Sequence, residues 1–152
     1  MQPPSETSVA NRSGDCKSPA LAVSLSHVNG RGVAVAFAEG QQVGLDLELI
    51  DARRAETVRK AVPLSPFEEA WLKTAALPEA TALLVLWTAR EALGKALGCG
   101  LACQWETLAL AEIQPAENGS WVGRYAQHPA LRCRSWVGPD SVLSVAWACA
   151  KA

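Results

Sequence analysis

The chain has 152 residues, a length that suits one domain with a real core, and 49% of the residues are hydrophobic. Its formal net charge of −1 excludes a general electrostatic attraction to nucleic acid or acidic membranes. No apolar run approaches the roughly 20 residues of a membrane span, and the first residues lack the features of a signal peptide. We therefore expect a cytoplasmic protein with neither nucleic acid nor membrane as a partner.

The N-terminal third predicts a leader followed by three strands. Residues 1–19 are rich in Pro, Ser, Asn and charged residues without an apolar period, which predicts a flexible leader before a single domain over residues 20–152. Segments 21–27 and 33–38 predict a β-hairpin, because Asn29-Gly30 between them is a strong turn signal. A third strand is expected over residues 43–49.

Helices are expected next, followed by more strands. A polar segment over 51–62 predicts a helix, and Ser65, Pro66 and Glu68 predict the capped start of a second one. The longest helix is expected over 80–97, ending at Gly98 or Gly100. Further strands are expected over 107–113, 120–125, 131–137 and 142–149. The order predicts an α+β fold, an antiparallel sheet with helices packed on one face, and no internal repeat is visible.

The cysteines indicate neither a zinc site nor a disulfide framework. Their number is odd and their spacing matches no zinc pattern. They are Cys16, Cys99, Cys103, Cys133 and Cys149. We expect reduced and mostly buried thiols.

Two short patterns carry chemistry. Asp46 and Glu48 are two apart in a predicted strand, so they point to the same side. Glu91 and Lys95 are four apart in a predicted helix and share one face. Each pattern alone is also typical of a solvated surface, either an edge strand or a helical ion pair. Together they favour a site that holds a hard divalent cation against a phosphate.

The same segments resemble a known family. Val43-Gly44-Leu45-Asp46 and Trp87-Thr88-Ala89-Arg90-Glu91-Ala92-Leu93-Gly94-Lys95 resemble the two motifs of the 4'-phosphopantetheinyl transferases, with Arg90 where lysine is usual. The segment 98–101 resembles the Gly-x-Gly-Leu that follows in this family. Upstream, Ser24-Leu25-Ser26-His27 is similar to a strand end of the larger, surfactin-synthetase-activating subfamily, and Lys17-Ser18-Pro19 is similar to a Lys-Pro element before it.

The resemblance implies a fold, a reaction and residue roles. It implies one phosphopantetheinyl-transferase-like half-unit plus an N-terminal hairpin. The implied reaction is Mg²⁺-dependent transfer of the phosphopantetheine arm of coenzyme A to a serine of an apo acyl or peptidyl carrier protein. The implied metal ligands are Asp46, Glu48 and Glu91; the catalytic residues are Asp46, Glu91 and Lys95; the coenzyme A contacts are Lys17, Ser26, His27, Arg90 and Lys95.

Partners and alternatives follow from the same pattern. The apolar strand 33–38 predicts a homo-oligomer, with a trimer favoured slightly over a dimer. A basic segment, Arg53, Arg54, Arg59 and Lys60, either docks an acidic carrier protein or is a solvated helix face. Two other functions stay open: a non-catalytic relative that binds coenzyme A or a carrier protein, and an unrelated Mg²⁺-dependent phosphate-transfer or hydrolysis enzyme.

Overall fold

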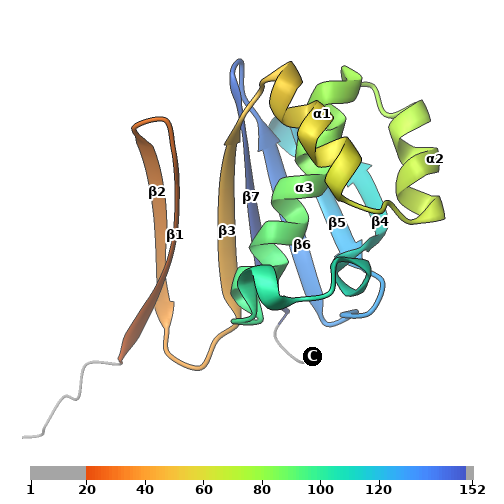
Figure 1. Ribbon diagram of the computed structural model, residues 1–152. Coiled ribbons are helices and arrows are strands. Elements are labelled where there is room, and N and C mark those ends of the chain that lie inside the picture. The colour runs from red at the N-terminus through yellow and green to blue at the C-terminus, as the bar shows by residue number, and fades with distance from the viewer. Residues whose placement is uncertain (1–19, 150–152) are drawn as a thin grey trace, which may run out of the picture.

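The computed structural model describes residues 20–149, which form two antiparallel sheets and three α-helices (Figure 1). The first sheet is the hairpin of β1 (Leu21–Val28) and β2 (Arg31–Ala38), and the second has the order β3-β7-β6-β5-β4. Its strands are β3 (Val43–Leu49), β4 (Leu110–Pro115), β5 (Ser120–Tyr125), β6 (Leu131–Val137) and β7 (Ser141–Ala148). The helices are α1 (Ala52–Ala61), α2 (Pro66–Thr74) and α3 (Glu79–Ala96). The predicted α+β class is confirmed.

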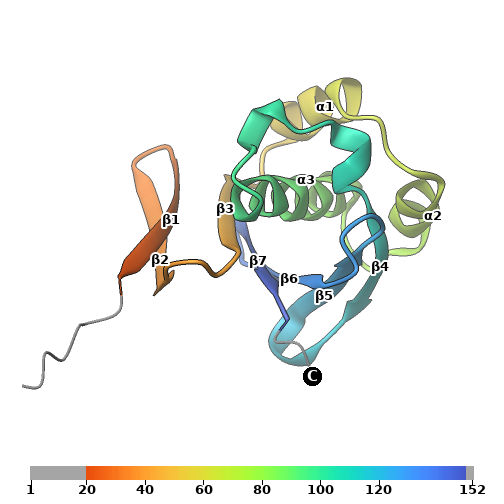
Figure 2. The ribbon, with the colours of Figure 1, turned by 90° about the horizontal axis from the view of Figure 1, so that it is seen from below.

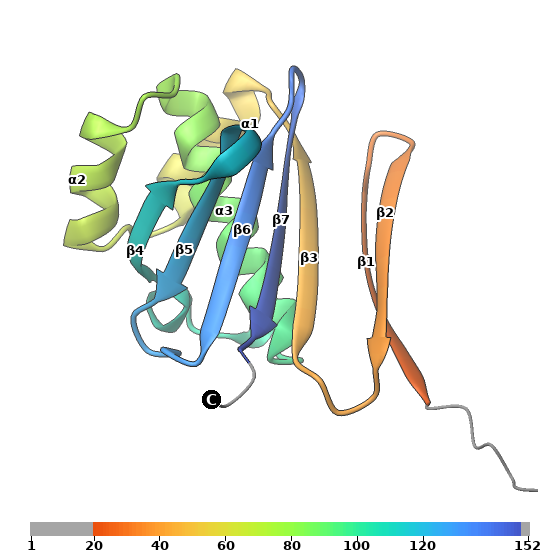
Figure 3. The ribbon, with the colours of Figure 1, turned by 180° about the vertical axis from the view of Figure 1, so that it is seen from behind.

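All three helices lie on one side of the five-stranded sheet. Helix α3 runs directly across the sheet and contacts β3, β6 and β7, with α1 and α2 beside it (Figure 2). Seen from behind, the strands of this sheet lie in front of the helices (Figure 3). The main core therefore fills the space between α3 and the sheet, and α3 is buried along most of its length. Among residues 20–149, no helix is both long and apolar enough to cross a membrane.

Local signals explain the element boundaries that sequence predicted well. Asn29 and Gly30 have φ of 45° and 77°, the left-handed conformation that a two-residue hairpin turn requires. At the start of α2, Ser65 Oγ accepts from the backbone N–H of Glu68 at 3.3 Å, while Glu68 Oε2 accepts from the Ser65 N–H at 2.8 Å. Gly98, at φ 73°, follows the end of α3.

The fourth strand begins later than predicted. Residues Trp105–Leu108 form a 3₁₀ turn, η2, and β4 starts only at Leu110. Thr107 Oγ1 donates to the carbonyl oxygen of Gln104 at 2.6 Å, a local bond that favours a turn over an extended strand. The strand start at residue 107 was therefore wrong by three residues.

The hairpin is attached to the edge of β3 through serine side chains. Ser24 Oγ and Ser26 Oγ accept the backbone N–H groups of Leu45 and Leu47, each at 3.1 Å. Since β3 pairs with β7 on its other edge, these hydroxyls satisfy donors that a neighbouring strand would otherwise take. The two sheets thus meet by side-chain contact, and this contact places β1 beside the acidic residues of β3.

The two hairpins of the fold differ in how their apolar faces are covered. In β1–β2, Leu21 pairs with Ala38 and Val23 with Ala36; in β6–β7, Leu131 pairs with Ala148 and Cys133 with Ala146. Leu131 and Cys133 are buried and α3 packs on β6–β7, whereas Leu21 and Val23 are 67% and 59% exposed. The β1–β2 hairpin therefore presents an open apolar face.

Candidate functional site

A pocket of about 660 Å³ lies between β1, β3 and α3. Its lining includes Ser26, His27, Asp46, Glu48, Glu91 and Lys95. The periodicities of a strand and a helix thus correctly placed the acidic residues and the lysine on facing surfaces. Trp87 and Arg54 complete the side nearest α1.

Asp46 and Lys95 form the centre of the pocket. Lys95 Nζ donates to Asp46 Oδ1 at 2.8 Å and to the carbonyl oxygen of Leu45 at 2.9 Å. Ser26 Oγ donates to the same Asp46 oxygen at 3.0 Å. Burial raises the pKa of the Asp46 carboxyl above its ordinary value, and the bonds from Lys95 and Ser26 offset this only in part. A further cation near Asp46 would therefore stabilise the charged form of its carboxyl group.

A glycine permits this contact between strand and helix. A Cβ atom on Gly44 would lie 2.5 Å from the backbone nitrogen of Ala96 and 2.9 Å from Lys95 Cβ, and closer still to the carbonyl oxygen of Ala92. Only glycine therefore allows β3 to approach α3 at the turn that carries Lys95. Gly44 is the motif glycine that the sequence placed two residues before Asp46.

Replacing Gly44 with alanine should consequently destabilise the fold by about 1–3 kcal/mol, because backbone atoms of α3 must move to admit the methyl group. Urea unfolding measures this change. Gly32→Ala is the matched control, since a Cβ there meets only the carbonyl oxygen of Ser26, at 3.9 Å. Equal stability of the two variants would contradict the close approach.

The other two carboxylates differ in their partners. Glu48 is 8% exposed, and its Oε2 accepts from Arg54 Nε at 2.8 Å. Glu91 is half-buried; burial raises its pKa, and the negative charge of Asp46 raises it further. The positive charges of Lys95 and Arg54 lower the pKa of Glu91, but they offset these two effects only in part. Glu91 thus accepts a proton more readily than an exposed glutamate does.

The carboxylates have the chemistry that suits a hard divalent cation, but their side chains are not gathered around one position. Oxygen donors on one strand face and one facing helix are what Mg²⁺ prefers. Within residues 20–149, however, no three acidic, His or Cys side chains are gathered as a metal-binding group. Asp46 and Glu48 contact Lys95 and Arg54 instead. A shared ion would therefore require these side chains to rearrange.

Ser26 and His27 occupy different positions at the pocket. Ser26 is 7% exposed, and its hydroxyl already bonds to Asp46 and to the Leu47 N–H. Its observed contacts position Asp46. His27 is exposed at the pocket rim, where its imidazole faces solvent. The third residue of this upstream group, Lys17, lies outside the described residues.

Comparison with known proteins agrees with the motif pattern. A family model described as the 4'-phosphopantetheinyl transferase superfamily matches residues 42–149, which include β3 and α3. The chain belongs to the 4'-phosphopantetheinyl transferase superfamily. No curated protein matches it. Superfamily membership supports a transferase and phosphopantetheine transfer in general.

The arginine that replaces the usual lysine of the superfamily motif does not line the pocket. Arg90 is fully buried; its Nε donates to Glu68 Oε1 at 3.1 Å, its Nη2 also bonds to Glu68, and its Nη1 donates to the Trp105 carbonyl oxygen at 2.8 Å. The predicted phosphate contact by Arg90 is therefore corrected: the side chain points away from the pocket and ties α3 to α2 and η2. Helix periodicity could have shown this, since Arg90 and Glu91 are adjacent and face different sides.

The predicted basic segment is largely neutralised by its own chain. Arg54 pairs with Glu48, Arg59 with Glu69 at 2.6 Å, and Lys60 with Glu56 at 2.6 Å. These bonds leave little net positive charge on that side of α1, which favours the solvated helix face over a docking surface for an acidic carrier.

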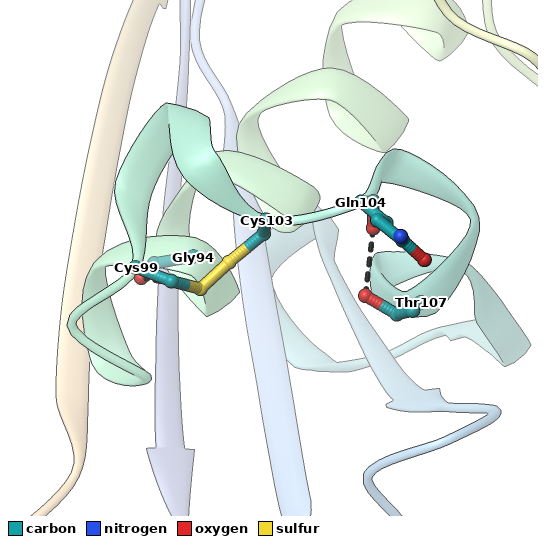
Figure 4. The surroundings of a disulfide bond; sticks show 5 residues. All are labelled: Gly94, Cys99, Cys103, Gln104 and Thr107. Carbon is teal, nitrogen blue, oxygen red and sulfur yellow. Dashed lines mark hydrogen bonds between the residues drawn. A yellow bond between two sulfur atoms is a disulfide. The ribbon is translucent and has the colours of Figure 1, made fainter.

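Two of the cysteines are joined, contrary to expectation. A disulfide links Cys99 to Cys103, whose Cα atoms are 5.4 Å apart, across the 3₁₀ turn η1 (Gly100–Ala102) (Figure 4). The prediction of reduced thiols is wrong for this pair, because the turn folds the two residues back on each other. Cys133 is the expected buried thiol, and burial raises its pKa to about 11, whereas Cys149 is exposed. Cys16 lies outside the described residues.

Two residues that line the pocket, Trp87 and Arg54, had no predicted role in it. Arg54 lies with its guanidinium carbon 4.9 Å from the centre of the Trp87 ring, and Trp87 stacks on Trp105 at 4.9 Å. Trp87 was assigned only to the apolar face and the motif, and Arg54 only to the basic segment. An arginine six residues after a buried strand glutamate is a local signal for an ion pair across a strand–helix turn, and it could have identified Arg54.

Proposed function

We propose that the chain transfers the 4'-phosphopantetheine arm of coenzyme A to a serine of an apo acyl or peptidyl carrier protein, with Mg²⁺, and releases adenosine 3',5'-bisphosphate. The observation that carries the proposal is the position of Asp46, Glu91 and Lys95 in one pocket, within the part of the chain that matches the superfamily. Two carboxylates and a lysine at one concave surface suit the binding of a pyrophosphate with its cation.

In the proposed reaction, the carrier serine oxygen attacks the pyrophosphate phosphorus that bears the pantetheine arm. A new oxygen–phosphorus bond forms, and the bond from that phosphorus to the bridging oxygen breaks, so adenosine 3',5'-bisphosphate leaves with the bond electrons. The serine proton passes to the Glu91 carboxylate. The raised pKa of Glu91 supports this role, because a general base works best when its pKa approaches the working pH.

The remaining pocket residues bind and orient charge. Lys95 Nζ lies 2.8 Å from Asp46 and would stabilise negative charge on the leaving phosphate. His27, at the rim, would donate to a phosphate oxygen. Bound Mg²⁺, with Asp46, Glu48 and Glu91 as its ligands, would neutralise the pyrophosphate oxygens.

Intact-mass measurement of an apo carrier protein tests this function. The chain is incubated with the carrier protein, coenzyme A and Mg²⁺, and the carrier mass should increase by one phosphopantetheine group. An unchanged carrier with intact coenzyme A would contradict the proposal. An unchanged carrier with released phosphate would indicate the phosphate-hydrolysing alternative.

One observation favours a non-catalytic relative as the second candidate. Asp46 and Glu48 both contact basic side chains of their own chain, so the pocket is stable without a metal. A binding protein would hold coenzyme A or a carrier protein in this pocket and leave both chemically unchanged. The same mass measurement separates the two functions, because binding alone adds nothing covalent to the carrier.

We also propose that the chain self-associates, through the outer face of the β1–β2 hairpin. The exposed large side chains there are Leu21, Val23 and Leu25, on β1 rather than on the predicted strand 33–38. The equivalent face of β6–β7 is covered by α3, and monomers rarely leave such a face open. Leu25 also lines the pocket, so a second copy on this face would extend the pocket wall.

Light scattering at micromolar concentration should therefore give a mass two or three times that of the 16.1 kDa chain. Val23→Glu should shift the protein to the monomer, because it places a charge in the apolar contact. Thr57→Glu, on the exposed side of α1, is the control and should leave the mass unchanged. A monomeric wild-type chain would refute self-association.

A further inference from the structure

The side chain of Arg54 forms an ion pair with the carboxylate of Glu48. Arg54 Nε donates to Glu48 Oε2 at 2.8 Å, and its guanidinium lies over the ring of Trp87. Glu48 Oε1 accepts from the Leu49 N–H at 3.3 Å. Strand β3, helix α1 and helix α3 thus meet at the Arg54 side chain, and a cation of the chain already neutralises Glu48.

The first turn of α1 fixes the backbone position of Arg54. Asp51 caps the helix, and its Oδ1 accepts the backbone N–H of Arg54 at 2.8 Å. The Arg54 side chain then separates two neighbouring cavities, since it lines both the main pocket and a second one of about 430 Å³. The second cavity also contains Asp51 and Asp140. Arg31 also lines this cavity and pairs with Asp140 at 2.7 Å, and both side chains are about half exposed. An Arg54 side chain that left Glu48 would therefore enter a space open to solvent.

The two basic residues of the site are not equally anchored. Lys95 Nζ bonds to Asp46 and also to the carbonyl oxygens of Leu45 at 2.9 Å and Leu25 at 3.4 Å. The Arg54 side chain bonds to Glu48 and stacks on Trp87, and it is 39% exposed. Its ion pair is accordingly the more screened and the easier to break. Of the two ion pairs, the one at Glu48 is the one that a bound cation would replace.

We propose that Arg54 is a built-in competitor for the divalent cation: it neutralises Glu48 in the metal-free protein, and cation binding at Asp46 and Glu48 displaces it into the second cavity. The inference rests on the proposed function for the existence of a metal site. It explains why three carboxylates lie on one pocket although no metal-binding group is gathered among residues 20–149. Arg54 would thereby lower the affinity of the site for the metal, and it would leave Glu48 only when a metal binds.

Metal binding by the wild-type chain and two variants tests this proposal. Affinity for Mn²⁺, a spectroscopic substitute for Mg²⁺, is measured by electron paramagnetic resonance on wild-type protein, Arg54→Ala and Arg53→Ala. Arg54→Ala should bind Mn²⁺ roughly three- to tenfold more tightly, the range expected for removing a partly exposed ion pair. Arg53→Ala removes the same charge from the adjacent exposed residue, so it should change the affinity less than twofold and separates competition from long-range charge.

A second measurement follows Arg54 directly. The NMR signal of its Nε–H group, assigned by its loss in Arg54→Lys, should show slow exchange with solvent because it is bonded to Glu48. Saturating Mg²⁺ should move this signal to the position of a solvated arginine. Displacement of the signal, together with tighter Mn²⁺ binding by Arg54→Ala, supports the proposal.

The outcomes separate the two ideas. Equal Mn²⁺ affinity of wild type and Arg54→Ala, or an Nε–H signal that stays in place with Mg²⁺ bound, overturns the role of Arg54 and leaves the metal site standing. Absence of Mn²⁺ binding in every variant overturns both. Competition at Glu48 in a chain that never modifies a carrier protein would retain this inference and refute the proposed function.

Discussion

Replacing Asp46 with alanine should lower the rate of carrier-protein modification by at least about 100-fold, the size of effect typical for removing a charge-stabilising group from an active site. Asp46 accepts bonds from both Lys95 and Ser26, so its loss removes a proposed metal ligand and also the contact that orients Lys95. Modification is measured by intact mass over time with coenzyme A and Mg²⁺.

The same variant should remain folded. Burial raises the pKa of Asp46, which means that its charged form is held unfavourably in the folded protein, and Lys95 keeps its bonds to the carbonyl oxygens of Leu45 and Leu25 in the variant. Glu112→Ala serves as control, since that exposed carboxylate pairs with Arg124 far along the sheet. A folded Asp46→Ala protein that keeps more than a third of the wild-type rate would contradict the assignment.

The largest effect on stability is expected at Glu68. Alanine there should reduce the free energy of unfolding by about 3–5 kcal/mol, because it leaves the fully buried guanidinium of Arg90 without its counter-charge. Glu68 Oε1 also accepts the Leu110 N–H at 3.1 Å, and Oε2 accepts the Ser65 N–H. One substitution thus removes an ion pair, the side-chain half of the α2 capping box and the anchor of β4.

Its neighbour provides a matched control. Glu69 pairs with Arg59 at the surface, where both side chains are more than a third exposed, so Glu69→Ala should destabilise the fold far less than Glu68→Ala. Urea denaturation of both variants gives the comparison. If Glu68→Ala were no less stable than Glu69→Ala, the buried pair could not be the contact that joins α2 to α3.

Sequence predicted those parts of the fold whose cause is local. The turn at Asn29-Gly30 and the capping box of Ser65 and Glu68 are encoded within a few residues, and both were found. Strand and helix periods were sufficient to place Asp46 opposite Lys95, although they lie 49 residues apart. Gly44 was found as a motif residue, and the structure supplies its physical reason, the close approach of α3.

The remaining features depend on contacts between distant segments. The pairing of Arg90 with Glu68 joins residues 22 apart, and a buried arginine cannot be distinguished from a phosphate ligand by the motif alone. The disulfide depends on the turn between Cys99 and Cys103, which no periodic pattern indicates.

The site itself is tested most directly by an amide NMR titration of isotope-labelled protein with coenzyme A and Mg²⁺. We expect the largest signal changes at residues 25–28 and 46–48 and at Trp87, Glu91 and Lys95, which line the pocket between β1, β3 and α3. A different cavity lies beside residues 40–43 and 147–149 and gives an internal comparison. Largest changes at residues 40–43 and 147–149, with the signals of Asp46, Glu91 and Lys95 unmoved, would contradict the assignment of the active site.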